Sequence, residues 1–68
     1  MSKNHFESLA AVFKEQQSVL NTSEYFNAEE RSAALRVLES TARTVAAVCA
    51  DANPRFDTRR FLAACGIN

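Results

Sequence analysis

Side chains that could carry out catalysis are few in this 68-residue chain, and their spacing does not bring them together. A cysteine nucleophile needs a neighbouring base, but the single histidine, His5, lies far in sequence from Cys49 and Cys65. Glu29 and Glu30 are adjacent, so on a helix they point about 100° apart and cannot act as a catalytic carboxylate pair. We therefore predict that the protein is not an enzyme and has no catalytic residue.

A metal ion or a cofactor is not indicated either. The two cysteines do not form a Cys-x-x-Cys motif, and one histidine does not complete a zinc ligand set. The only glycine, Gly66, cannot make a glycine-rich phosphate loop. Cys49 and Cys65 stand at apolar helical positions, which predicts two reduced, buried thiols. The alternative is a disulfide between them, if the last helix folds back with suitable geometry. We expect no cofactor and no small-molecule substrate.

A group of arginines near the end of the chain is a candidate for binding a macromolecule. Arg59 and Arg60 fall in the first turn of a predicted helix, where positive charge is disfavoured by the helix dipole. Arg55 is close by. The cluster could grip an acidic protein surface or a phosphate, or it could be a solvated face with local ion pairs to Asp51 and Asp57.

The connection before the long helix and the outer face of that helix supply the other candidates. Tyr25 and Phe26 are adjacent aromatic residues, and we expect Phe26 to be buried while Tyr25 either packs on the helix ends or binds a partner. Arg36 and Arg43 lie on the polar face, where Arg43 follows Glu39 at the i+4 position that favours an ion pair. The predicted partner-binding residues are Tyr25, Arg36, Arg43, Arg55, Arg59 and Arg60.

Three helices are predicted to position these side chains, and the longest spans about residues 28–52. Asn27 is a favoured N-cap, and Glu30 completes a capping box. Pro54 ends the helix because it disfavours helical geometry at Asn53. Apolar residues recur every three or four positions, as on one face of a helix. They are Leu35, Leu38, Ala42, Val45, Cys49 and Ala52, and the stripe is widened on one side by Ala34, Val37, Thr41 and Val48.

The first helix is predicted at about residues 4–20, ending where the polar sequence 21–23 favours a turn. Its apolar stripe consists of Phe6, Leu9, Phe13 and Leu20, with Val12 and Val19 at the edge. The resulting fold class is all-α, a single small helical domain over 1–68. We expect the first two helices to form an antiparallel hairpin, with a short third helix folded back across the end of the second.

That short C-terminal helix, about residues 58–65, is specified at both of its ends. Asp57 is a favoured N-cap. Phe56 and Phe61 stand at the two positions that form a hydrophobic staple. Gly66 suits the left-handed position that closes a Schellman motif.

A chain of this length can build only a marginal core, and it has little with which to cover a helix roughly 37 Å long. We therefore expect a homodimer through the long helix, with either part of the apolar stripe or the smooth side around Ala46 and Ala47 as the interface. The alternative is an ordinary core stripe in a monomer. No apolar run reaches membrane-spanning length, and the start shows no secretory signal. We expect a cytoplasmic protein with no membrane contact.

The charges are balanced but unevenly placed. Residues 1–30 carry two lysines and five glutamates, a net charge of −3, whereas residues 31–68 carry six arginines and three acidic residues, a net charge of +3. The split could help the two halves pack, or it could present two surfaces to different partners. Zero net charge argues against binding dominated by phosphate contacts, so nucleic acid is the second choice of partner, behind a protein target.

The tail of the chain resembles an ending found in small, mostly uncharacterised proteins of bacteriophages and other bacterial mobile elements. The resemblance rests on NPRFD at 53–57 and RFLAACG at 60–66, within a segment of about 15 residues. It implies a small accessory protein in a bacterial or phage-infected cytoplasm. Such proteins bind and block host complexes, including CRISPR–Cas effectors and other defence systems. The alternative is a small nucleic-acid-associated regulator that uses the C-terminal arginines.

Overall fold

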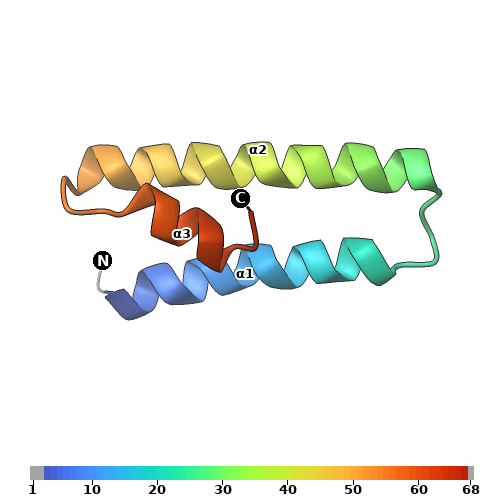
Figure 1. Ribbon diagram of the computed structural model, residues 1–68, viewed down its shortest axis with the longest axis horizontal. Coiled ribbons are helices and arrows are strands. Elements are labelled where there is room, and N and C mark those ends of the chain that lie inside the picture. Colours follow the sequence, from blue (N-terminus) through green and yellow to red (C-terminus); the bar gives the residue numbers. More distant parts are fainter. Residues whose placement is uncertain (1–2, 68) are drawn as a thin grey trace.

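The computed structural model describes residues 3–67, and over that range the chain is all-helical, with three helices and no strand (Figure 1). The helices are α1 (Lys3–Thr22), α2 (Ala28–Ala52) and α3 (Thr58–Ala64). The predicted all-α class and the number of helices are confirmed. The predicted bounds agree with the observed ones to within two residues.

The long helix α2 begins and ends at the predicted residues because both ends are set locally. The Asn27 side chain accepts a hydrogen bond from the Glu30 amide at 2.8 Å, and the Asn27 amide donates to the Glu30 carboxylate at 3.0 Å. This reciprocal pair is the predicted capping box. At the other end Asn53 is extended, with φ −141° and ψ 106°, immediately before Pro54.

Helix α1 continues two residues beyond the predicted end. The Thr22 hydroxyl donates to the Ser18 carbonyl at 2.9 Å, and the Ser23 amide donates to the Val19 carbonyl at 2.9 Å. The polar residues that were expected to compete with the helix therefore complete its last turn.

Helix α3 ends one residue earlier than predicted, and its capping follows the predicted motifs. Gly66 has φ +83°, its amide donates to the Ala63 carbonyl at 3.0 Å, and the Ile67 amide donates to the Leu62 carbonyl at 2.9 Å. These two bonds define a Schellman motif, which needs a left-handed residue that glycine adopts without strain. At the start, the Asp57 carboxylate accepts from the Arg60 amide at 3.0 Å.

Helices α1 and α2 run side by side in opposite directions, and α3 lies across one side of the pair and touches both (Figure 1). The molecule is elongated, with extents of 40 × 18 × 16 Å. The α1–α2 connection lies at one end and the α2–α3 connection at the other (Figure 1). Within residues 3–67, α3 covers one side of the helical pair, and no third layer lies on the opposite side.

Small side chains let the three helices approach closely. Ala42 and Ala46 of α2 are fully buried, and Ala10 of α1 is 1% exposed. The rest of the buried cluster comes from α1, from α3 and from the residues after it: Phe13, Phe61, Cys65 and Ile67. Leu9, Leu38, Val45, Phe56 and Leu62 pack against it while partly exposed.

Two expectations about α2 are wrong. Ala46 belongs to the core, so the side around Ala46 and Ala47 is not one free surface. Val37 and Val48, which were expected to widen the core stripe, are 67% and 64% exposed. The reason is that α1 and α3 cover an arc of α2 centred on Ala42 and Ala46, and the two valines lie outside that arc.

Both cysteines are buried and free, so the alternative of a Cys49–Cys65 disulfide is not realised. Burial raises the pKa of the Cys65 thiol, because a thiolate loses hydration there.

We expect Cys65 to react with iodoacetamide at pH 8 more slowly than Cys49, which keeps 9% exposure. In guanidinium chloride both thiols should react rapidly, because unfolding exposes them. Peptide mass spectrometry over a time course measures the two rates separately. Equal rapid labelling of both thiols without denaturant would contradict this packing.

None of the helices within residues 3–67 has the combination of length and apolar character that crossing a membrane requires.

Candidate functional site: an aromatic cleft between the first and third helices

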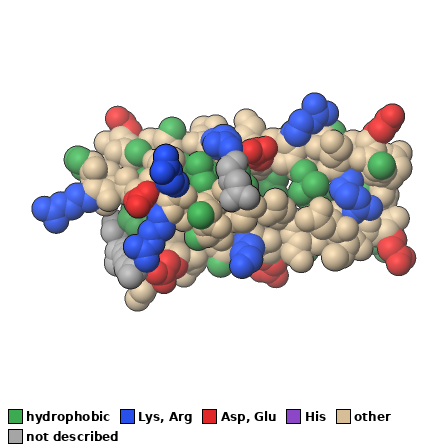
Figure 2. Space-filling view, in the orientation of Figure 1, with side chains coloured by type: hydrophobic (Ala, Val, Ile, Leu, Met, Phe, Trp, Pro, Cys, Tyr) green, Lys and Arg blue, Asp and Glu red, His purple; other side chains and the backbone are tan. Residues whose placement is uncertain are grey.

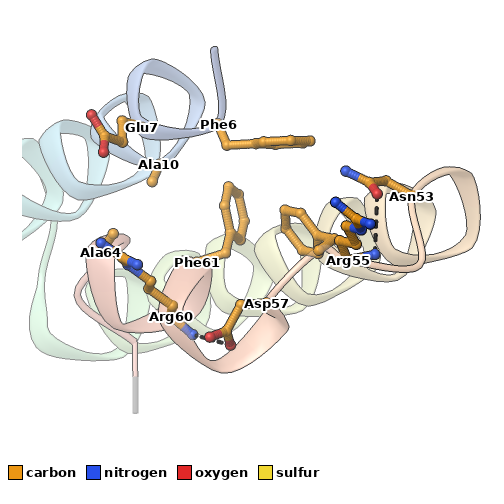
Figure 3. A pocket seen from close by; sticks show the side chains of 10 residues that line it. Phe6, Glu7, Ala10, Asn53, Arg55, Asp57, Arg60, Phe61 and Ala64 are labelled. Atoms are coloured by element: carbon orange, nitrogen blue, oxygen red, sulfur yellow. Dashed lines mark hydrogen bonds between the residues drawn. The ribbon is translucent and has the colours of Figure 1, made fainter. Parts of the chain in front are cut away.

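An open cleft of about 490 Å³ lies at the end where α2 turns into α3 (Figure 3). Three segments of the chain form it: the first two turns of α1, the connection after α2, and α3. The lining residues are Phe6, Glu7, Ala10, Asn53, Arg55, Phe56, Asp57, Arg60, Phe61 and Ala64. We call this site the aromatic cleft.

Three phenylalanines make the apolar wall of the aromatic cleft. The rings of Phe6 and Phe56 have centroids 4.8 Å apart, and those of Phe56 and Phe61 are 5.4 Å apart, both tilted. Phe61 also meets Phe13 edge-on at 6.4 Å, which links the wall to the buried core. Figure 3 shows Phe6 and Phe61 pointing into the same space from α1 and α3. Such tilted contacts are the favoured geometries of aromatic pairs.

The predicted staple explains why two of these rings meet. Phe56 precedes the N-cap of α3, and Phe61 stands at the fourth helical position, so their contact sets the angle at which the chain enters the helix. Asn53 fixes the turn before it, because its side chain accepts from the Arg55 amide at 3.1 Å. The wall is therefore built on capped, locally determined backbone.

Charged side chains stand at both ends of the aromatic cleft. Arg55 lies beside Asn53 at one end, whereas Arg60 and Glu7 lie toward the other end (Figure 3). The Asp57 carboxylate is already engaged with the Arg60 amide. Chemically, the cleft offers an apolar surface with a guanidinium group at each end, which suits an apolar side chain flanked by acidic or carbonyl groups.

The structure brings only two of the six predicted site residues together at this cleft, Arg55 and Arg60. Arg59 is exposed and is not among the lining residues. The reason is the helical geometry of α3, since neighbouring residues point about 100° apart. The predicted cluster of three arginines is thus divided between the cleft and the open surface.

Arg36 and Arg43 lie along α2, away from the cleft. The predicted pair of Arg43 with Glu39 is present, with an N–O distance of 2.9 Å. Arg36 borders a smaller groove of about 280 Å³, which is also lined by Gln17, Leu35 and Ile67. Figure 2 shows the Lys and Arg side chains of this face spread along the molecule with acidic side chains among them, rather than gathered into one basic surface.

Tyr25 lies in the α1–α2 connection, at the opposite end of the molecule from the aromatic cleft. Its side chain is 94% exposed, so it does not pack on the helix ends. The expectation that Phe26 is buried is wrong, since that side chain keeps 36% of its surface exposed. The connection is too short and too polar to fold two aromatic rings onto the hairpin.

The connection that carries Tyr25 is held by a residue that sequence reasoning treated only as a charge. The Arg31 guanidinium donates hydrogen bonds to the carbonyls of Leu20, Ser23 and Phe26, the last two at 3.0 Å. It therefore satisfies carbonyl groups at the end of α1 and in the connection, which lack helical partners. The only sequence signal for this role of Arg31 is its position, in the first turn of a helix that follows a short connection.

No group of three or more His, Cys, Asp or Glu side chains that could hold a metal ion occurs within the described part of the chain. Comparison of the chain with protein-family models, with curated proteins and with solved structures found no match.

Proposed function

We propose that this protein acts by stoichiometric binding to a protein target, without catalysis, and that the aromatic cleft is its main contact. The observation that carries the proposal is the open cleft with three phenylalanines on its wall and an arginine at each end. Aromatic residues and arginine are enriched at protein interfaces, where a few anchoring residues carry most of the binding energy. Tyr25 would add a second contact at the far end of the molecule, where its ring is almost wholly in solvent.

The setting that we propose is a bacterial or phage-infected cytoplasm, with a host complex such as a defence system as the target. The resemblance of the tail to accessory proteins of phages and mobile elements supports this choice. We also propose that the protein works as a homodimer, because α3 covers only one side of the helical pair. If the protein is an inhibitor of this kind, adding it alone, in molar excess over the target, should suppress the target's activity.

Capture from bacterial lysate with the tagged protein, with and without nuclease, identifies the target. A defined host complex retained after nuclease supports the proposal. Capture that disappears with nuclease would instead support a nucleic-acid-associated regulator. That second candidate has one observation in its favour, since Arg55, Arg59 and Arg60 are all exposed on one short segment. Added salt separates the two, because phosphate contacts weaken steeply with ionic strength.

Reversing the two cleft arginines, as R55E/R60E, should weaken binding of the captured target by roughly thirtyfold or more, the loss that corresponds to about 2 kcal/mol at an interface hot spot. R59E is the matched control, because Arg59 belongs to the same segment but does not line the cleft. Titration calorimetry gives the affinities, and circular dichroism checks the fold. If R59E lowered the affinity as much as R55E alone and R60E alone, the result would argue for phosphate contacts instead of binding in the cleft.

A further inference from the structure

Four valines on α1 and α2 are exposed although the chain is short of apolar residues to bury. Val12 and Val19 of α1 are 55% and 50% exposed, and Val37 and Val48 of α2 are 67% and 64% exposed. Together with Tyr25 and Phe26 of the connection, they are the large apolar side chains that the described chain leaves most open to solvent. We call the four valines the valine face.

Helical geometry places the valine face on the side of the pair away from α3. Ala10 lines the aromatic cleft, and Gln17 lines the groove beside Gly66, so both face the third helix. Val12 and Val19 each follow one of them by two positions, which is about 200° around a helix. Val37 is likewise two positions from Leu35, which lines the groove beside Ile67. All of these offsets turn a side chain to the opposite side.

The α2 part of the valine face has the spacing of a helix-pairing seam. Val37, Thr41, Thr44 and Val48 follow one another at intervals of four, three and four residues, the pattern of the inner positions of a heptad. All four are β-branched and none is charged. The two threonine hydroxyls are already satisfied, because Thr41 donates to the Val37 carbonyl at 2.9 Å and Thr44 to the Ser40 carbonyl at 3.0 Å. Burying this stripe would therefore leave no hydroxyl without a partner.

The order Val-Thr-Thr-Val is the same in both directions along the helix. We infer that the valine face is the surface on which a second copy of this chain packs, with the two α2 helices antiparallel. A two-fold axis between Thr41 and Thr44 then sets Val37 against Val48 of the other copy and Thr41 against its Thr44. An interface of this kind must be complementary to itself, and the palindromic stripe meets that requirement. This inference rests on the proposed homodimer and specifies its surface and register.

The side of the molecule that carries the valine face is large enough for a stable dimer interface. A surface 40 Å long and 18 Å wide, the two larger extents of the molecule, has an area of about 720 Å². A standard protein interface buries about 800 Å² on each partner. Two helical pairs stacked in this way would form a four-helix bundle, with α3 and the aromatic cleft of each copy on the outside and free to bind a target.

The surface is tested by sedimentation velocity on the full chain and on two single variants. The wild type should be a dimer at tens of micromolar protein. V37R should be a monomer, because each copy would bury one arginine in the interface without a charged partner. A47R is the matched control. Ala47 is also exposed on α2 but lies about 80–100° around the helix from Val37 and Val48 and about 60° from Thr44, so A47R should stay a dimer. Circular dichroism should be unchanged in both, since neither residue is in the core.

Cysteine pairing tests the register. Mixed V37C and V48C variants should form a covalent 37–48 dimer on oxidation, and each variant alone should form little. Efficient 37–37 or 48–48 pairing would overturn the antiparallel arrangement. A dimer that survives V37R would overturn the valine face while leaving the homodimer intact. A wild type that is monomeric throughout would overturn both, and the target-binding result for R55E/R60E would stand independently of either.

Discussion

Replacing Phe61 by alanine should leave the protein largely unfolded at 25 °C. Phe61 is 5% exposed, and its ring contacts both Phe13 in the core and Phe56 in the cleft. Truncating a buried phenylalanine to alanine costs about 3–5 kcal/mol, and a core of this size rarely supplies more than about 3–5 kcal/mol in all. Urea unfolding followed by circular dichroism at 222 nm measures the change.

Phe26→Ala is the matched control for this prediction, because it removes the same atoms from a ring that keeps 36% exposure. We expect it to cost roughly 1 kcal/mol, the value near which point mutations in general are centred, because the ring is only partly covered. A cooperative transition in F61A with a midpoint close to that of F26A would mean that α3 does not complete the core. In that case the aromatic cleft would not be a fixed feature of the protein.

The second large effect is expected at Arg31. Replacing it by methionine keeps the length of the side chain but removes the donors to Leu20, Ser23 and Phe26. Hydrogen bonds from charged groups contribute about 1.5–3 kcal/mol. Because Arg31 is partly exposed, the lower end, about 1.5 kcal/mol, is the expected loss of unfolding free energy. Arg36→Met, on the exposed surface of the same helix, should cost less than about 0.5 kcal/mol.

Hydrogen exchange distinguishes a local role of Arg31 from a global one. In R31M the amides near Tyr25, at the turn between α1 and α2, should exchange faster than the loss of global stability alone explains, because the connection opens locally. Unchanged protection there, together with unchanged stability, would show that the three hydrogen bonds contribute nothing. Weaker target binding by R31M would indicate that the connection must be held for Tyr25 to make its contact.

The parts of the fold that could be predicted are those that neighbouring residues determine. Asn27 with Glu30, Phe56 with Phe61, and Gly66 each act within a few residues, and each capping motif formed as expected. Helix α1 runs two residues past its predicted end because the Thr22 hydroxyl can bond to its own helix as readily as to a turn.

The candidate site was harder to predict because it depends on which segments meet. Phe6 and Phe56 are far apart in the chain, and nothing near either of them indicates their contact. A helical repeat shows that Val37 is near an apolar stripe but cannot show which side α3 covers. The same applies to the arginines, since a charge cluster in the sequence does not reveal that Arg59 turns away while Arg55 and Arg60 border one cleft.

The position of Ile67 in the core has a consequence for the order in which the chain folds. Ile67 is 7% exposed and Cys65 is fully buried, so the core is complete only when residues 65–67 have joined it. The α1–α2 pair involves closer parts of the chain and can form earlier. Until those residues dock, both sides of the α1–α2 pair are without cover, so this is the stage at which aggregation or chaperone binding should compete with folding.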